Sequence, residues 1–189
     1  MLALSQAELG ILDWIYTHCH NAFLDTLMPA ITWLGDKGLL WIILGLCILI
    51  FQKGKRDTGF RVLLALLFGV LICNVLLKNA VGRIRPFALN DAVSLLVAPP
   101  EDPSFPSGHT TAAFAAATVL IRDHWNGRWV VLAAAILVAI SRLYLYVHFP
   151  TDVLCGALIG VFCGWLSTVL WEKVIGPRWA MHQKKRPHP

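Results

Sequence analysis

The chain has 189 residues, of which 57% are hydrophobic and only 14% charged, and its mean hydropathy is +0.65. Soluble domains usually have about 25% charged residues, so this composition excludes an ordinary soluble enzyme and indicates a membrane protein. One crossing takes about 20 helical residues, which leaves room for a handful of crossings and short loops. We therefore expect residues 1–189 to form a single all-α domain, a polytopic helix bundle within the membrane.

The first predicted elements occupy residues 9–34, where acidic and histidine side chains are mixed with aromatic and aliphatic ones. This mixture predicts an amphipathic helix at the membrane interface that leads into a partial crossing. Residues 39–51 form the next predicted crossing. A helix of 13 residues spans only about 20 Å, so this crossing must continue into residues 31–38 or pass through a thinned region. The first ten residues hold no Lys or Arg, and we expect no cleavable signal peptide.

Four further stretches predict spanning helices, because they are long apolar runs with few or no charges. They cover residues 62–77, 105–121, 129–147 and 153–171. With the two N-terminal elements they predict about six transmembrane helices and an N-terminal interfacial segment. In the last stretch Gly156, Gly160 and Gly164 recur every four residues, which predicts a close helix-packing face.

The basic residues predict the orientation of the bundle. Eleven of the 16 Lys and Arg residues lie in residues 52–61, in residues 122–128 and in the tail from residue 173 onward. An even number of crossings separates these segments, so the positive-inside rule places all three, and the C-terminus, on the cytoplasmic side. Topology thus accounts for most of the net charge of +5, and we do not expect nucleic acid as a partner.

Five basic residues remain, and four of them lie at the opposite ends of the helices, where the rule disfavours cations. The five are Lys37, Lys78, Arg83, Arg85 and Arg142. A bound anion on the extracytoplasmic face would explain why they are there.

Three motifs lie at that outer level, each at a predicted helix end. They are Lys78 followed by Arg85-Pro86, then Pro106-Ser107-Gly108-His109, and then Ser141-Arg142 followed by His148 and Asp152. Ser107 and Gly108 begin a helix, whose free amides and positive dipole end favour a phosphate group. In the third motif we predict Thr151 as the N-cap of the last helix, with Asp152 just inside it.

The cations of these motifs suit phosphoryl transfer. Lys78, Arg85 and Arg142 would supply three positive charges to a phosphoryl group whose charge spreads over its oxygens. The outer acidic residues, such as Asp102, lie in a proline-rich loop without evident partners, and no metal-ligand spacing occurs. We therefore expect the cations to act in place of a metal ion, with no cofactor.

Two histidines complete the predicted chemistry. Asp152 follows His148 by four positions, close enough to hold one ring nitrogen while the other attacks phosphorus. His109, beside the helix amides, is placed to protonate the leaving oxygen and then to activate water. These residues predict hydrolysis through a phosphohistidine.

The three motifs together resemble those of the type-2 phosphatidic acid phosphatase and vanadium haloperoxidase superfamily, and the helices around them resemble its six-span membrane phosphatases. The resemblance implies that His148 is phosphorylated, that Asp152 orients it and that His109 is the acid. The residues that it implies for phosphate binding are Lys78, Arg85, Ser107, Gly108 and Arg142. Several polyprenyl-diphosphate phosphatases of the family have aspartate where this chain has Gly108, which favours a glycerophospholipid substrate.

The expected function is hydrolysis of a lipid phosphomonoester or diphosphate at the extracytoplasmic surface of the cell membrane. Phosphatidylglycerophosphate, phosphatidic acid and undecaprenyl diphosphate are the candidate substrates, and a lipid A phosphatase stays open. Two alternatives remain: a vanadate-dependent haloperoxidase that uses the same pocket, and a lipid-binding membrane protein without catalytic activity. The sequence leaves the oligomeric state open.

Overall fold

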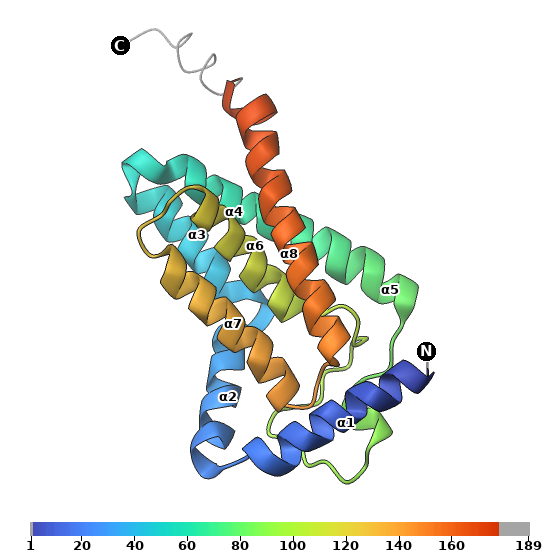
Figure 1. Cartoon of the computed structure of the whole chain (residues 1–189). Coiled ribbons are helices and arrows are strands. Elements are labelled where there is room, and N and C mark those ends of the chain that lie inside the picture. The colour runs from blue at the N-terminus through green and yellow to red at the C-terminus, as the bar shows by residue number, and fades with distance from the viewer. Residues whose placement is uncertain (1, 178–189) are drawn as a thin grey trace, which may run out of the picture.

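The computed structural model describes residues 2–177, and every regular element in that range is helical, as the all-α prediction requires (Figure 1). Seven α-helices have 13 residues or more: α1 (Leu2–Cys19), α2 (Ala22–Leu34), α3 (Leu39–Phe51), α4 (Arg56–Gly69), α6 (Gly108–Arg122), α7 (Arg128–Tyr144) and α8 (Pro150–Leu170). The shorter elements are η1 (Asp36–Gly38), η2 (Lys53–Lys55), η3 (Val70–Leu77), α5 (Lys78–Val81), η4 (Pro86–Leu89) and η5 (Trp171–Ile175). The π-helical segment η3 joins α4 to α5 without a break.

Within residues 2–177, two helical segments are long and apolar enough to cross a membrane. They are Lys53–Leu89 and Pro150–Ile175, and α2 and α3, bent by 51° where they meet, add a third if they form one crossing. A membrane protein is thus supported, whereas the predicted six crossings are not confirmed. The helices α6 and α7 have 15 and 17 residues and are shorter than the predicted spans 105–121 and 129–147.

The predicted span 129–147 was too long at its C-terminal end. The helix α7 ends at Tyr144, and Tyr146 has a positive φ of 57°, which no helix accommodates. The apolar side chains that prolonged the predicted span are buried instead of facing lipid, since Tyr146 packs with Leu12 of α1, and Leu145 and Val147 pack with Met28 of α2. His148 lies on the same short turn, between the end of α7 and the start of α8.

The N-terminal element predicted over residues 9–34 consists of two helices. Asn21 separates them and caps α2, because its side chain accepts a hydrogen bond from the Leu24 amide at 3.0 Å. Figure 1 shows α1 lying across the end of the bundle where α7 ends and α8 begins. The amphipathic segment therefore covers the ends of other helices.

The predicted glycine face of α8 is confirmed as a packing face against α6. A Cβ atom on Gly160 would lie 2.5 Å from the carbonyl oxygen of Thr111, and one on Gly164 would lie 2.7 Å from that of Ala115. Only hydrogen atoms fit between the two backbones at these positions. The close contact fixes the start of α6 beside the start of α8.

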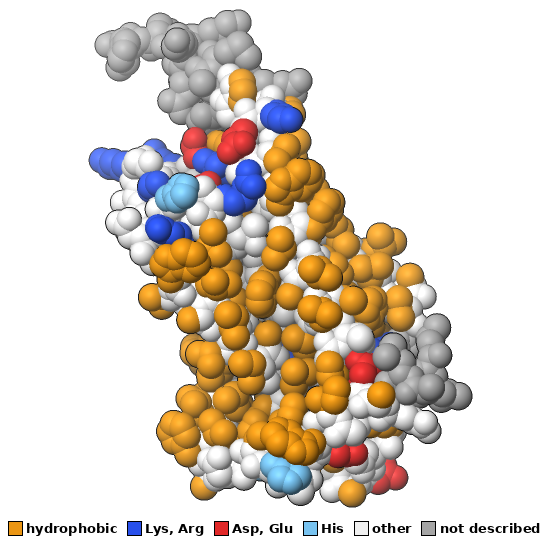
Figure 2. All heavy atoms as spheres, in the orientation of Figure 1, with side chains coloured by type: hydrophobic (Ala, Val, Ile, Leu, Met, Phe, Trp, Pro, Cys, Tyr) orange, Lys and Arg blue, Asp and Glu red, His pale blue; other side chains and the backbone are white. Residues whose placement is uncertain are grey.

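Lys and Arg side chains gather at the end of the molecule where α3 turns into α4 and α6 into α7, and hydrophobic side chains cover the middle (Figure 2). At that end Arg61 and Asp123 form an ion pair of 2.8 Å. The basic tail residues from Arg178 onward, on which part of the orientation prediction depends, lie outside the described residues. The motif residues lie at the opposite end of the helices.

Candidate active site

Six of the eight predicted site residues line one cavity of about 1260 Å³. They are Lys78, Arg85, Gly108, His109, Arg142 and His148. Lys78 begins α5, Arg85 lies in the segment between α5 and η4, and Gly108 and His109 begin α6. Arg142 lies near the end of α7 and His148 in the turn before α8. Motifs that lie far apart in the sequence therefore meet at a single site.

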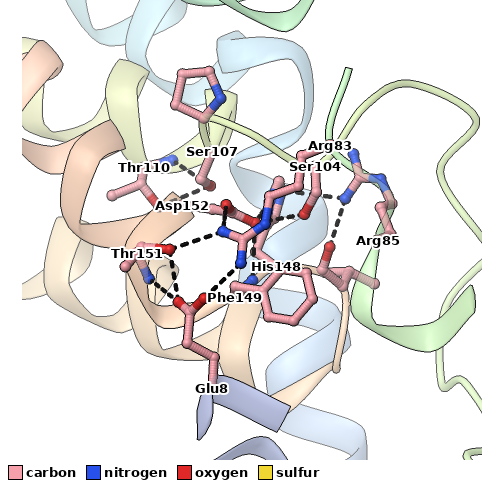
Figure 3. A network of polar contacts seen from close by, with 12 residues as sticks. Glu8, Arg83, Arg85, Ser104, Ser107, Thr110, His148, Phe149, Thr151 and Asp152 are labelled. Carbon is pink, nitrogen blue, oxygen red and sulfur yellow. Dashed lines mark hydrogen bonds and ion pairs between the residues drawn. The ribbon is translucent and has the colours of Figure 1, made fainter. Parts of the chain in front are cut away.

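The remaining two, Ser107 and Asp152, are fully buried behind the cavity wall. The helix α6 starts where the sequence predicted, and Ser107 caps it, since its hydroxyl accepts from the amide of Thr110 at 3.5 Å and from the Thr110 hydroxyl at 3.0 Å (Figure 3). Its own amide, which was expected to face phosphate, donates to the backbone oxygen of Asp152 at 3.0 Å. Ser107 thus ties the start of α6 to the start of α8.

His148 faces a carboxylate with one ring nitrogen and a guanidinium with the other. Its Nδ1 lies 3.6 Å from Oδ2 of Asp152, and its Nε2 lies 3.3 Å from Nη1 of Arg85. Burial, together with the charges of Arg142 and Arg85, lowers the pKa of His148 to about 3, although Asp152 acts in the opposite direction. The imidazole is therefore neutral near pH 7, and because the Arg85 guanidinium can only donate, Nε2 is the unprotonated nitrogen and Nδ1 carries the proton.

Asp152 has a full set of hydrogen-bond donors (Figure 3). Oδ2 accepts from the hydroxyl of Ser104 at 2.5 Å and from the amide of Phe149 at 2.9 Å, and Oδ1 accepts from Nη1 of Arg83 at 2.6 Å. The sequence pointed to neither Ser104 nor Arg83 as a partner of Asp152. Proximity to the Ser107 motif was the only available signal for Ser104.

The predicted N-cap of α8 was wrong. The helix begins at Pro150, whose fixed φ and missing N–H suit the first helical position, and Phe149 is the N-cap. Asp152 is then the third helical residue, and its carboxylate accepts from the N-cap amide. Thr151 instead donates both its amide and its hydroxyl to Glu8 of α1.

His109 lies at the first turn of α6, with about a fifth of its side chain exposed. Its Nε2 is 3.6 Å from Oδ1 of Asp36, which lies in the η1 turn between α2 and α3. The Asp36 carboxylate is therefore close enough to orient the His109 imidazole. The sequence did not indicate Asp36, because it lies far from the three motifs.

Asp102 was expected to have no partner and was misjudged. Its carboxylate forms ion pairs with Lys78 and, at 2.8 Å, with Nη2 of Arg85, and its backbone oxygen accepts from Nε of Arg85 at 2.8 Å. Burial disfavours the charged carboxylate, but the two cations outweigh this effect and lower the pKa of Asp102 to about 2. The two cations thus converge on a single anionic group, as binding of a phosphate would require.

Arg142 is almost fully buried at the end of α7. Its Nη1 donates to the hydroxyl of Thr32 on α2, while its buried Nε makes no hydrogen bond to any described residue. A buried guanidinium nitrogen without an acceptor is costly, and a bound anion in the cavity would offset that cost.

The cavity extends from the cations along an apolar wall. Its lining there comes from α2, α3, α4 and η3 and includes Trp33, Ile42, Leu63, Leu67 and Val70. Several of these side chains are well exposed at the protein surface, with Trp33 at 75% and Leu67 at 52%. The site therefore combines a cationic end with an apolar groove.

A family model described as the PAP2 superfamily matches residues 58–175. The chain is 31% identical over 147 residues to an undecaprenyl-diphosphatase from Sulfolobus acidocaldarius, covering 77% of this chain and 70% of that relative. It is 32% identical over 169 residues to a lipid A 4'-phosphatase from Bacteroides thetaiotaomicron, covering 82% and 73%. The crystal structure of a transmembrane PAP2 type phosphatidylglycerolphosphate phosphatase from Bacillus subtilis superposes with a TM-score of 0.75 at 29% identity, covering 92% of this chain and 89% of that one. The resemblance predicted from the three motifs is confirmed, and this chain belongs to the PAP2 superfamily.

Proposed function

We propose that this protein is a membrane lipid phosphatase that hydrolyses a lipid phosphomonoester or diphosphate through a phosphohistidine on His148. Residues 1–189 act as one domain, with the catalytic motifs within residues 78–152. The observation that carries the proposal is the single cavity, which joins a buried histidine and three cations to an apolar groove. A phosphate headgroup fits the first part and a hydrocarbon chain the second.

Phosphate binding is assigned to the cations and to the start of α6. Lys78, Arg85 and Arg142 would neutralise the phosphoryl oxygens, with the backbone of Gly108 beside them. Ser107 contributes as the cap that orients the first turn of α6. The incoming phosphate takes the place of the Asp102 carboxylate on Lys78 and Arg85.

In the first step Nε2 of His148 attacks phosphorus and the bond from phosphorus to the lipid oxygen breaks. His109 donates a proton to that oxygen. The leaving group is a lipid alcohol for a monoester and a lipid monophosphate for a diphosphate. The imidazole then carries the phosphoryl group on Nε2 and a proton on Nδ1, and Asp152 stabilises the resulting positive charge.

In the second step His109 takes a proton from water, and the water oxygen attacks phosphorus. The phosphorus–nitrogen bond breaks, which releases inorganic phosphate and returns His148 to its neutral form. Asp36, 3.6 Å from His109, is placed to orient that imidazole in both steps. The three cations supply the charge stabilisation, so no metal ion is assigned a role.

Three lipid classes are supported by the names of the relatives: undecaprenyl diphosphate, lipid A and phosphatidylglycerophosphate. Although Gly108 favours a glycerophospholipid, undecaprenyl diphosphate is the first substrate to test, because the Sulfolobus relative named undecaprenyl-diphosphatase aligns with 77% of this chain. Phosphatidic acid, the simplest monoester with the same chemistry, completes the panel.

We also propose a multi-pass arrangement of about six crossings, with the site at the extracytoplasmic face and the C-terminus in the cytoplasm. The concentration of Lys and Arg at the opposite end of the bundle supports this orientation (Figure 2). The many exposed apolar side chains on α3, η3 and α8 support contact with lipid along the bundle. A headgroup at the outer surface would then enter the cavity by lateral diffusion.

The test is phosphate release from the four lipids in detergent, with purified His148→Ala as the blank. We expect release from at least one lipid by the parent protein, inhibition by vanadate, and full activity in EDTA. Release by His148→Ala at the parent rate would contradict the mechanism, and loss of activity in EDTA with recovery in Mg²⁺ would contradict the role given to the cations. Bromide oxidation stimulated by vanadate, without phosphate release, would favour a haloperoxidase.

A further inference from the structure

A buried carboxylate from α1 lies next to the start of α8, on the side of Asp152 away from the cavity. Glu8 is only 4% exposed. Its Oε1 accepts from the amide of Thr151 at 2.8 Å and from the Thr151 hydroxyl at 2.6 Å, and its Oε2 accepts from Nη2 of Arg83 at 2.5 Å (Figure 3). Glu8 thus contacts both Thr151, which precedes Asp152 in the chain, and Arg83, which donates a hydrogen bond to Asp152.

Arg83 joins the two carboxylates. While Nη2 contacts Glu8, Nη1 donates to Oδ1 of Asp152 at 2.6 Å and to the hydroxyl of Thr151 at 2.8 Å. The guanidinium lies over the ring of Phe149, 3.8 Å from its centroid. Two different nitrogen atoms of one planar group therefore fix the distance between Glu8 and Asp152, which a lysine could not do.

The orientation of Asp152 depends on this guanidinium. Oδ2 is held by Ser104 and by the amide of Phe149 and faces Nδ1 of His148. Oδ1 is held by Arg83. If Arg83 moved, Oδ1 would lose its donor, and only the two hydrogen bonds to Oδ2 would hold the carboxylate, which could then tilt relative to the imidazole.

A second carboxylate also sets the net charge beside His148. Arg83 alone would neutralise Asp152 and weaken its attraction for the proton on Nδ1 of His148. With Glu8 present, the cluster of Glu8, Arg83 and Asp152 keeps one net negative charge. In this buried setting such charges interact strongly.

We propose that Glu8 is a positioning residue for phosphate release, which acts by holding Arg83 against Asp152. This inference rests on the proposed function, because it requires His148 and Asp152 to take part in the reaction. Glu8 lies outside residues 58–175, to which the family model matches. The helix α1 thus completes a site whose motifs all lie later in the chain.

The test compares kcat and KM for phosphate release by the purified full chain in detergent. Glu8→Gln keeps an oxygen for Thr151 and replaces the charged oxygen that accepts from Arg83 with an NH2 group, which cannot accept. We expect kcat to fall about 10- to 100-fold, as for a misaligned reacting group, with KM within about twofold, because no phosphate contact is lost. Arg83→Lys, which keeps the charge but not the two-pronged geometry, is expected to behave in the same way.

Asp13→Asn is the matched control. Asp13 is on the same helix and accepts from the hydroxyl of Tyr146 at 2.6 Å, so it also anchors α1 to the turn before α8, but it does not contact Arg83 or Asp152. We expect its kcat to equal that of the parent. A fall in kcat for Asp13→Asn as large as that for Glu8→Gln would show that α1 has only an anchoring role.

A double-mutant cycle separates positioning from general damage. In the Asp152→Asn background, Glu8→Gln should change kcat by less than about twofold, since its effect passes through the missing carboxylate. A further fall equal to that in the parent would overturn the proposal. If Glu8→Gln does not fold, Glu8→Gln combined with Arg83→Gln removes both charges of the pair and carries the same test, and parent-like kcat in that variant would overturn the proposal.

The two proposals fail in different ways. If the parent releases no phosphate from any lipid, or if His148→Ala is as active as the parent, the proposed function is wrong. If the parent is active, His148→Ala is inactive and Glu8→Gln matches the parent, only the role of Glu8 is wrong.

Discussion

Nδ1 of His148 lies 3.6 Å from Oδ2 of Asp152, and both side chains are almost entirely buried. The separation is slightly longer than a hydrogen bond, and in the proposed mechanism it would shorten once Nε2 carries a phosphoryl group and the ring becomes cationic. We therefore expect Asp152 to matter most after the attack on phosphorus.

Asp152→Asn keeps the shape of the side chain and removes its charge. We expect kcat for phosphate release to fall on the order of 10²- to 10⁴-fold, as when the carboxylate that holds a catalytic imidazole is lost. The control is Asp123→Asn, another buried carboxylate in an ion pair, at the other end of the bundle. Equal losses in the two variants would mean that Asp152 acts only on stability.

Acidification should destabilise the protein through His148. Its pKa of about 3 in the folded protein lies below the ordinary value of 6.5 because of burial and of Arg142 and Arg85. Below pH 6.5 the unfolded chain gains a proton that the folded chain does not, so this contribution to stability is complete above about pH 6.5 and is lost as the pH falls toward 3.

The melting temperature in detergent measures this effect between about pH 7.5 and pH 5. His148→Asn cannot titrate and should lose less of its melting temperature over that interval than the parent. Parallel curves for the two proteins would show that His148 does not contribute.

Asp102→Ala should lower KM. The carboxylate of Asp102 holds Lys78 and Arg85 in the free enzyme, and a ligand that must displace it binds with a reduced apparent affinity. We expect a fall of roughly 3- to 10-fold in KM, measured with the best lipid of the panel. Asp91→Ala, in the same loop, is the control. A rise in KM for Asp102→Ala would mean instead that Asp102 helps to arrange the cations for phosphate.

Gly160→Ala should destabilise the contact between α6 and α8. The new Cβ atom would lie 2.5 Å from the Thr111 oxygen and 2.9 Å from Cβ of Phe114, and forced overpacking costs about 1–3 kcal/mol. Gly10→Ala in α1 meets nothing within 4 Å and should be neutral or slightly stabilising. Thermal unfolding in detergent compares the two, and equal stability would contradict the close packing.

Much of the fold follows from local sequence features. Composition and apolar runs predicted an all-helical membrane protein, and three short motifs predicted the PAP2 superfamily. Apolarity alone could not separate lipid-facing residues from those buried under α1. For that reason the span predicted over residues 129–147 ran past Tyr144 into a turn.

The sequence predicted the site residues that lie within the motifs and missed those that lie outside them. Those within the motifs lie around one cavity or directly behind it, although their roles in catalysis stay predictions. Glu8, Asp36 and Asp102 were not anticipated because each reaches the site only through tertiary packing. An isolated carboxylate carries no sequence pattern that distinguishes a buried partner from an exposed charge.

The most direct test of the account is to trap the phosphorylated enzyme. The parent and His148→Asn are mixed with a lipid whose terminal phosphate is radiolabelled, and the reaction is quenched within one turnover. We predict protein-bound label in the parent that is stable in base and labile in acid, and none in His148→Asn. Equal labelling of the two proteins, or hydrolysis by His148→Asn at the parent rate, would contradict a phosphohistidine on His148.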